Sequence, residues 1–458
     1  MKRSYSSASW GQRSVIGIVA LGAGLSACRA CSKDDGAVGP ASPPSVVADA
    51  SVVAEVLPRC RAGTERIGIA GDEVVMGDVA IGKDALYAGV IRLERGKRIG
   101  SVLRAPLDLS TSRMIDVGPP FGDDPPPSPR LHGSSSYVAF YSGRSSDAGA
   151  RVRPLTVARL DDGAVGKVEG TIVQQADEST DFDVAWNDSG VGLVAWDEDA
   201  PPPSDGGDPA SGAFEGRGFV KVQVLGSSTR RVASPESSDA ESPRLLTRSG
   251  GGFWLAWLAR RGEEEAYSVE GPGERRAFRW VEAVALTATG EAAGPVRRVS
   301  SEKGRATSFE LGRSGDELVV LVQDEAAVSE GGGARLVRYV VGAKIESAEV
   351  VDGGVGSTLA ELVPVPAGDL VDGGARWLAF TDGAERLHVA PLGRGLLPVG
   401  QATPEPSLDG SRVLASVSPD RLYALVLGSI EPGKEGVRPE LRRFTCSPLE
   451  GAHSAEQK

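Results

Sequence analysis

The sequence of 458 residues is poor in the residue types that most metal and redox sites use. It contains 3 His, 4 Cys and 3 Met, which leaves little material for a histidine-rich or cysteine-rich metal centre. Aromatic residues make up 5% of the chain. Acidic residues outnumber basic ones by 62 to 50, so the net charge is −12. Because a nucleic-acid binder needs a basic surface to displace counterions, we expect no nucleic-acid partner.

Two broad classes are excluded by what the sequence does contain. With 60 Gly and 30 Pro, the chain is rich in turn formers, yet 40% of it is apolar. It is therefore neither collagen-like nor wholly disordered. The length allows roughly three ordinary domains or one large repeat domain.

The N-terminus has the parts of a secretory signal. Residues 1–27 carry Lys2, Arg3 and Arg13, no acidic residue, and an apolar stretch of about ten residues from position 15. That stretch is too short for a membrane-spanning helix, which needs roughly 20 residues. It ends in Leu-Ser-Ala-Cys at residues 25–28, which resembles the lipobox of bacterial lipoproteins. The resemblance covers residues 1–28 only, and the alternative is a chance cysteine beside an ordinary signal peptide.

The lipobox resemblance implies a cellular location for the protein. It implies cleavage before Cys28, acylation of Cys28 and a lipid-anchored place in the bacterial cell envelope. Cys31 fits the small-residue pattern less well, because Arg29 and Ala30 precede it. Removal of residues 1–27 changes the net charge to −15, so we expect acyl chains rather than basic residues to hold the protein at the membrane. Residues 28–58 have no helical or strand period and are predicted to form a flexible tether.

One short apolar strand recurs along the rest of the chain. We count seven copies, spaced by 51, 56, 61, 64, 59 and 45 residues when they are aligned on the third position. Each is a continuous apolar run, as expected for a strand buried on both faces. The copies are residues 86–89, 137–140, 193–196, 254–257, 318–321, 377–380 and 422–425.

The segments that flank the copies recur as well. Ser-Pro-Arg precedes two of them, at residues 128–130 and 242–244. A third strand ending in a glycine turn follows the copies, as in 155–160 and 281–286, and a fourth short segment closes the unit. Four strands repeated every 45–64 residues resemble the blade of a β-propeller.

The sequence therefore predicts an all-β fold: one β-propeller of about seven four-stranded blades over residues 59–447, followed by a polar tail over 448–458. Stacked blades would bury the faces that a single blade leaves open. Six or eight blades, or a tandem of β-sandwich domains, remain open. The proline runs at 125–127 and 201–203 are interpreted as surface insertions.

The two ends of this region predict how the propeller closes. The last unit offers three strands and lacks a fourth, whereas residues 65–70 form an orphan strand ahead of the first unit. We expect that N-terminal strand to complete the last blade, which removes two exposed sheet edges. Cys60 lies beside the orphan strand and Cys446 ends the last unit. In an oxidising compartment they could form a disulfide, and the alternative is two free thiols.

No motif in the sequence assigns a reaction. The Asp-box, the Gly-x-Ser-x-Gly elbow, the phosphate loop and the His-Glu-x-x-His motif have no good copy. His132, His388 and His453 lack metal-ligand spacing. We therefore assign no catalytic residue, no metal and no cofactor, and we expect a monomer.

The sequence leaves two main functions open, besides a scaffold domain that has no small-molecule site. The first is a non-catalytic lipoprotein whose propeller binds a protein or envelope glycan. The alternative is a propeller enzyme that acts on glycans, as a hydrolase or a lyase. Convergent carboxylates or an arginine cluster at the central channel would favour the enzyme, whereas small or apolar residues would favour the binding protein.

Overall fold

The computed structural model describes residues 60–71, 73–120, 124–142, 152–175, 180–199, 218–235, 238–260, 266–268, 275–325, 334–349, 361–362, 376–381, 387–392, 403–405, 411–418, 421–427 and 439–446. Within these ranges the chain is all-β. Among the same residues, no helix is long and apolar enough to cross a membrane. The predicted signal peptide, tether and tail, the proline run at 201–203, and Cys28 and Cys31 lie outside them.

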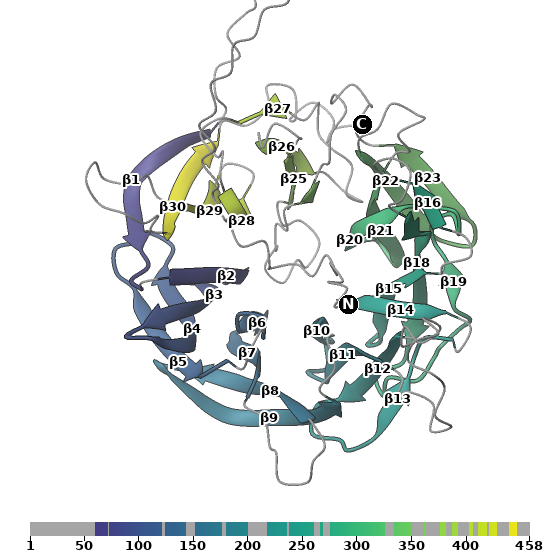
Figure 1. The fold of residues 1–458 in the computed structure, drawn as a ribbon, viewed down its shortest axis with the longest axis horizontal. Helices are drawn as coiled ribbons and strands as arrows, with labels where there is room; N and C mark the ends of the chain where they lie inside the picture. Colours follow the sequence, from purple (N-terminus) through teal and green to yellow (C-terminus); the bar gives the residue numbers. More distant parts are fainter. Residues whose placement is uncertain are drawn as a thin grey trace, which may run out of the picture. The chain divides into compact units, whose positions relative to one another are not determined.

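The described strands form seven four-stranded antiparallel sheets and one two-stranded hairpin, and Figure 1 labels them in chain order. The first two sheets comprise β2 (Glu73–Ile81), β3 (Ala85–Glu94), β4 (Lys97–Pro106) and β5 (Arg113–Gly118), and then β6 (Ser128–His132), β7 (Ser135–Tyr141), β8 (Val152–Asp161) and β9 (Ala164–Gln175). The third sheet comprises β10 (Phe182–Trp186), β11 (Gly192–Asp199), β12 (Gly218–Val224) and β13 (Arg230–Val232). The fourth comprises β14 (Asp239–Thr247), β15 (Phe253–Arg260), β18 (Arg279–Leu286) and β19 (Arg297–Arg298). The hairpin of β16 (Ala266–Ser268) and β17 (Arg275–Ala277) comes between β15 and β18 in the chain.

The remaining three sheets follow the same order until the last one. The fifth and sixth comprise β20 (Ala306–Ser314), β21 (Glu317–Glu325), β22 (Ala334–Val341) and β23 (Ile345–Glu349), and then β24 (Glu361–Leu362), β25 (Arg376–Thr381), β26 (Leu387–Leu392) and β27 (Thr403–Pro404). The last sheet comprises β28 (Ser411–Ser418), β29 (Arg421–Leu427), β30 (Pro439–Cys446) and β1 (Cys60–Gly68). Sheets of four consecutive antiparallel strands are the blades that the repeat predicts.

The last sheet joins the two ends of the described chain. β1 pairs antiparallel with β30, with Cys60 opposite Cys446 and Ile67 opposite Leu441; in Figure 1 the purple β1 lies beside the yellow β30. Cys60 and Cys446 form a disulfide, the pairing that the sequence predicts. The hydrogen bonds and the disulfide together leave neither strand as an unpaired edge on that side.

The recurring second strand is apolar on both faces because a different neighbouring sheet covers each face. In β11, Leu193 and Ala195 pack into one core cluster with the fourth sheet, whereas Val194 and Trp196 pack into another with the second sheet. Successive strand residues point to opposite faces, so both sets are buried. The central alanine of the copies leaves room for this close approach: Ala88, Ala139, Ala195 and Ala256 are all buried.

The prediction that residues 125–127 form a surface insertion is wrong. Pro126 and Pro127 are buried and pack against β3. A Cβ atom at Gly89 would lie 1.6 Å from the carbonyl oxygen of Pro127, so only glycine fits there. The first copy of the repeat ends in Gly89, where four of the other six copies end in an aromatic residue and two end in leucine, because the proline segment occupies that space.

Candidate active site

The two Ser-Pro-Arg motifs lie on first strands, one on β6 and the other on β14. The first strands of four consecutive sheets contact one another in the order β2, β6, β10 and β14. This brings charged residues from four repeats into one group, which we call the arginine–carboxylate cluster. It comprises Asp78, Arg130, Asp181, Asp183 and Arg244.

Each motif serine holds an aspartate from a preceding sheet. Ser128 donates its hydroxyl hydrogen bond to Oδ2 of Asp78, and Ser242 donates to Oδ2 of Asp181 over 2.6 Å. Among the described residues, neither aspartate receives a donor at Oδ1. Two equivalent contacts therefore present two carboxylates, each with one oxygen that no donor of the described residues occupies.

The two motif arginines differ in their partners. The Arg130 guanidinium lies 2.9 Å from Oδ2 of Asp78 and 3.0 Å from Oδ1 of Asp183. Asp183 is buried and also accepts the backbone N–H of Val184 and of Leu245, both over 2.8 Å. Both carboxylate oxygens of Asp183 thus accept hydrogen bonds from groups of the protein. The side chain of Asp78, in contrast, is 46% exposed.

The contacts of Arg244 differ from those of Arg130. Its guanidinium donates to the carbonyl of Pro243 over 2.9 Å, as Arg130 does to Pro129. Burial alone would lower the pKa of Arg244, but the surrounding carboxylates of Asp183, Glu310, Asp181 and Asp78 raise it. Arg244 is therefore a fixed cation in a carboxylate-rich environment.

The environments of the two partly buried aspartates, Asp78 and Asp181, move their pKa values in opposite directions. Burial would raise the pKa of Asp78, but the charge of Arg130 and the hydrogen bonds from Ser128 and Arg130 lower it overall. Burial raises the pKa of Asp181, and Arg244 and the Ser242 hydroxyl offset only part of that rise. Two carboxylates whose pKa values are separated in this way are what general acid and base chemistry requires.

Two β-bulges set the orientation of Asp78 and of Ser242. The β2–β3 register shifts between Met76 and Val79, which places Asp78 in a β-bulge. The β14–β15 register shifts between Glu241 and Arg244, which places Ser242 in another. Ser242 has a φ of 54°, a left-handed conformation that costs free energy for any residue except glycine. Bulges of this kind redirect side chains beside functional sites.

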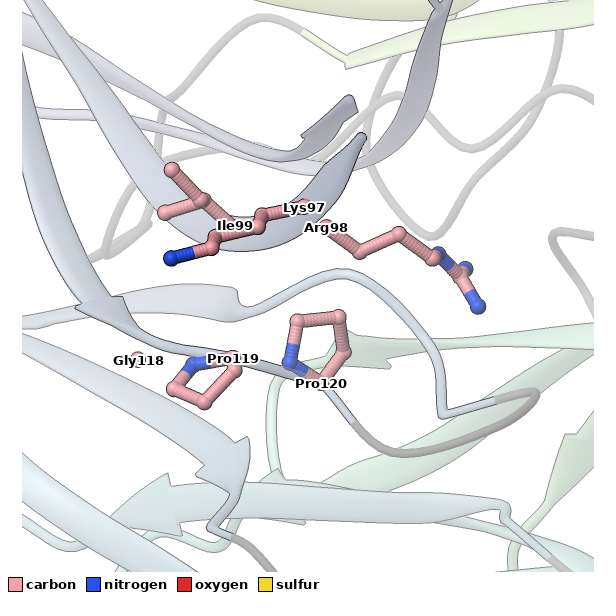
Figure 2. A pocket seen from close by; sticks show the side chains of 6 residues that line it. All are labelled: Lys97, Arg98, Ile99, Gly118, Pro119 and Pro120. Carbon is pink, nitrogen blue, oxygen red and sulfur yellow. The ribbon is translucent and has the colours of Figure 1, made fainter. Parts of the chain in front are cut away.

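A separate pocket lies at the β3–β4 turn (Figure 2). Its described lining consists of Lys97, Arg98 and Ile99 from β4 and Gly118, Pro119 and Pro120 at and after the end of β5. Figure 2 shows Lys97 and Arg98 extending in opposite directions, as neighbours on a strand do. No carboxylate or nucleophile is among these six residues, so the pocket offers less chemistry than the cluster.

Two of the three histidines, His132 and His388, lie among the described residues, and His453 lies outside them. Among the described residues, no group of three His, Cys, Asp or Glu side chains is placed to hold a metal ion. His132 stacks near Trp186, with 6.2 Å between ring centroids, and His388 is buried on β26.

The residues of the cluster are not among those that the sequence predicts as site residues. Ser-Pro-Arg is visible as a repeated motif, but no role follows from it for Arg130 or Arg244. Of the predicted site residues, Cys60 and Cys446 are brought together, whereas Cys28 lies outside the described residues. The recurrence of Ser-Pro-Arg ahead of two copies was the signal that could have pointed to the site.

Comparisons with known proteins bear on the fold. No protein-family model matches the chain, and no curated protein matches it. Among solved structures, the polysaccharide lyase Uly1 is 8% identical with a TM-score of 0.47 over 81% of this chain and 89% of that chain. An ulvan lyase of family PL25 is 11% identical with a TM-score of 0.49 over 82% of this chain and 95% of that chain.

A third similar structure is a puromycin-hydrolysing peptidase of Mycobacterium tuberculosis, 12% identical with a TM-score of 0.47. The match covers 83% of this chain but 54% of the peptidase. At these identities the likeness concerns the fold alone, an all-β, propeller-like architecture.

The expectation of a non-catalytic binding propeller is wrong. The described first strands bring together carboxylates and arginines, the kind of grouping expected of an enzyme rather than of a binding protein. An enzyme, the class named in the alternative, agrees better with this grouping.

Proposed function

We propose that this protein is a propeller enzyme that hydrolyses glycosidic bonds at the arginine–carboxylate cluster. The observation that carries the proposal is the pair of equivalent serine–aspartate contacts, Ser128–Asp78 and Ser242–Asp181. In one of them an arginine binds the carboxylate directly, and in the other it does not. The pKa of Asp78 is lowered, whereas that of Asp181 is raised.

The reaction needs these two states. Asp181 would act as general acid: Ser242 donates to its Oδ2, which leaves Oδ1 to carry the proton and deliver it to the glycosidic oxygen. Asp78 would act as general base, because Arg130 keeps it ionised and its Oδ1 can take a proton from the attacking water. The glycosidic C–O bond breaks as the water oxygen bonds to the sugar carbon, and each product gains one hydroxyl group.

Arg130 is a positioning residue in this scheme. It touches both Asp78 and the buried Asp183, so it holds the base at a fixed place and stabilises its charge. Asp183, whose oxygens accept internal donors, anchors Arg130 rather than reacting.

The experiment is a cleavage assay with the full-length protein in detergent. Reducing ends released from a panel of neutral and acidic polysaccharides are compared for the wild type, Asp181→Asn, Asp78→Asn and Asp162→Asn. Asp162 is the matched control because its side chain is 87% exposed and lies on the β8–β9 turn. We expect loss of at least a hundredfold in turnover for Asp181→Asn and Asp78→Asn and none for Asp162→Asn. Full activity of Asp181→Asn, or no cleavage of any polysaccharide by the wild type, would refute the proposal.

We further propose that the seven sheets are the blades of one closed propeller, with β1 as the outermost strand of the last blade. The pairing of β1 with β30 and the Cys60–Cys446 disulfide support this closure. Contact between β28 of the last sheet and β2 of the first supports the count of seven.

We also propose that the protein is a monomeric, lipid-anchored component of the bacterial cell envelope, with Cys28 as the acylated residue. The disulfide supports an oxidising compartment, and an envelope glycan would lie within reach of the anchored enzyme. Incorporation of labelled palmitate into the wild type and into Cys31→Ser, but not into Cys28→Ser, is the expected result. Label that persists in Cys28→Ser would contradict it.

A further inference from the structure

Asp197 is a buried acidic residue that the proposed reaction does not use. It directly follows the third copy of the repeated strand, on β11, and is 6% exposed. The residues that follow the other six copies carry no charge: Val90, Tyr141, Leu258, Val322, Thr381 and Val426. The repeat therefore does not need a carboxylate at this place. Because a buried carboxylate costs free energy unless it is hydrogen-bonded, its contacts indicate what Asp197 does.

Three hydrogen bonds join Asp197, Ser242 and Asp181 into a closed loop. The backbone N–H of Asp197 donates to the carbonyl of Asp181 over 3.3 Å. The backbone N–H of Ser242 donates to Oδ2 of Asp197 over 3.1 Å, and the Ser242 hydroxyl donates to Oδ2 of Asp181 over 2.6 Å. Asp197 thus binds the backbone of Asp181 and also the residue whose hydroxyl binds the Asp181 carboxylate.

The contact with Asp197 stabilises Ser242 in an unfavourable conformation. The φ of Ser242 is 54°, in the left-handed region that a residue with a side chain adopts only where its surroundings hold it there. The β14–β15 register skips Ser242, and its N–H donates to the Asp197 carboxylate. The other motif serine, Ser128, does not have a positive φ. In the first sheet the place of Asp197 is taken by Val90, whose side chain cannot accept a hydrogen bond.

We propose that Asp197 is a positioning residue for the general acid. It holds Ser242 in the left-handed conformation, so that the hydroxyl faces Oδ2 of Asp181 and the proton of Asp181 is confined to Oδ1. The inference rests on the proposed function, because it concerns the acid of that reaction. Asp197 acts through Ser242 and does not itself touch the reacting atoms.

Two possible roles of Asp197 would move the pKa of Asp181 in opposite directions. The hydrogen bond from the Ser242 hydroxyl lowers the pKa of Asp181. If Asp197 positions that hydroxyl, removal of the Asp197 carboxylate should raise the pKa of Asp181. If Asp197 acted only through its negative charge, its removal should lower that pKa. The other charges that act on Asp181 are those of Arg244, Glu241 and Asp78, and they stay in place in every variant.

The first measurement is a pH titration of Asp181 by carbon-13 NMR. The full-length protein in detergent carries labelled aspartate carboxyl carbons, and the Asp181 signal is assigned by its absence in Asp181→Asn. We expect the pKa of Asp181 to rise in Asp197→Ala but not in Asp197→Asn, because the amide oxygen can still accept the Ser242 N–H. In a Ser242→Ala background, Asp197→Ala should not raise the pKa further, since the hydroxyl is already gone.

The second measurement is turnover on a polysaccharide that the cleavage assay identifies as a substrate. Asp197→Ala should lower kcat at least tenfold and change KM less than twofold, because the acid acts in the transition state. Asp197→Asn should keep kcat within threefold of the wild type. Asp239→Ala is the matched control: Asp239 also accepts a backbone N–H, that of Gly218 over 2.7 Å, but it is not part of the loop of hydrogen bonds around Asp181. It should change kcat less than twofold and leave the titration of Asp181 unchanged.

The outcomes separate this inference from the proposed function. An unchanged or lowered pKa of Asp181 in Asp197→Ala, or a loss in kcat below tenfold, would overturn the inference even if Asp181→Asn abolishes cleavage. A raised pKa together with full cleavage by Asp181→Asn would retain the action of Asp197 on Asp181 and refute the proposed reaction. If Asp197→Ala does not unfold cooperatively, Asp197→Val replaces it under the same criteria, since valine stands at this place in the first and fifth sheets. Failure of both variants to fold would overturn the inference, because Asp197 would then serve the fold rather than the acid.

Discussion

Removing the Cys60–Cys446 disulfide should lower the thermal stability of the protein by an amount that follows from its loop length. The two cysteines are 386 residues apart in sequence. In the chain-entropy relation a cross-link over such a loop destabilises the unfolded chain by about 6 kcal/mol. Unfolding entropy of roughly 2.1 cal/mol/K per residue, summed over about 390 residues of the propeller region, converts this to about 7 °C in Tm.

The assay compares thermal unfolding of the wild type, the double variant Cys60→Ser/Cys446→Ser and the control Cys31→Ser. We expect a decrease of about 4–7 °C in the double variant, because native strain and residual structure reduce the ideal value. Hydrogen exchange should rise first at β1 and β30, whose pairing the disulfide covers. A decrease below about 1 °C, with unchanged exchange at β1 and β30, would refute the reasoning that this bond holds the two ends of the chain together.

Three further predictions concern the cluster and the proline segment. At pH 7, Asp78→Asn should lower the free energy of unfolding by about 1 kcal/mol, a value reduced for solvent exposure, whereas Asp181→Asn should raise it. The pKa of Asp78 is lowered in the folded state, so its contribution is present above the usual value of 3.8 and is lost as pH falls. The pKa of Asp181 is raised, so above pH 3.8 ionisation of this group favours the unfolded chain, and that destabilisation disappears as pH falls toward 3.8. Equal signs for the two variants in urea unfolding at pH 7 would contradict this. Turnover should be bell-shaped in pH, falling at low pH as Asp78 is protonated and at high pH as Asp181 ionises; a profile flat from about pH 4 to 9 would contradict it. Gly89→Ala should destabilise by about 1–3 kcal/mol or more because its Cβ meets Pro127, whereas Gly68→Ala, with open space around its Cβ, should not; equal Tm values would show that the segment is not packed there.

The repeated strands could be predicted because burial on both faces leaves a strong local signal. The apolar run at residues 254–257 falls within β15, which packs Leu255 and Trp257 to one side and Ala256 and Leu258 to the other. The pairing of β1 with β30 could be predicted by counting strands. The last repeat unit has three strands instead of four, and the strand at residues 65–70 belongs to no other unit. The same reasoning failed for residues 125–127, because proline composition does not reveal that Gly89 makes room for them.

The arginine–carboxylate cluster could not be predicted because its contacts cross between repeats. Ser128 and Asp78 are 50 residues apart, and Ser242 and Asp181 are 61 apart. The two aspartates also stand in unlike local sequences, one inside β2 and the other just before β10. The bulges that aim Asp78 and Ser242 shift the strand register, which a periodic sequence pattern does not show. Only the recurrence of Ser-Pro-Arg was visible, and its chemistry depends on partners that folding brings together.

The most direct test of the central claim is the dependence of Asp181→Asn turnover on the leaving group. A general acid matters when the departing oxygen needs a proton, and matters little when the leaving group is a good one. With a sugar that the cleavage assay identifies as a substrate, Asp181→Asn should lose at least a hundredfold in kcat on the natural glycoside and less than fivefold on its 2,4-dinitrophenyl glycoside. Asp78→Asn should be impaired on both. Equal losses on the two substrates in Asp181→Asn would contradict the assignment of Asp181 as the acid at this site.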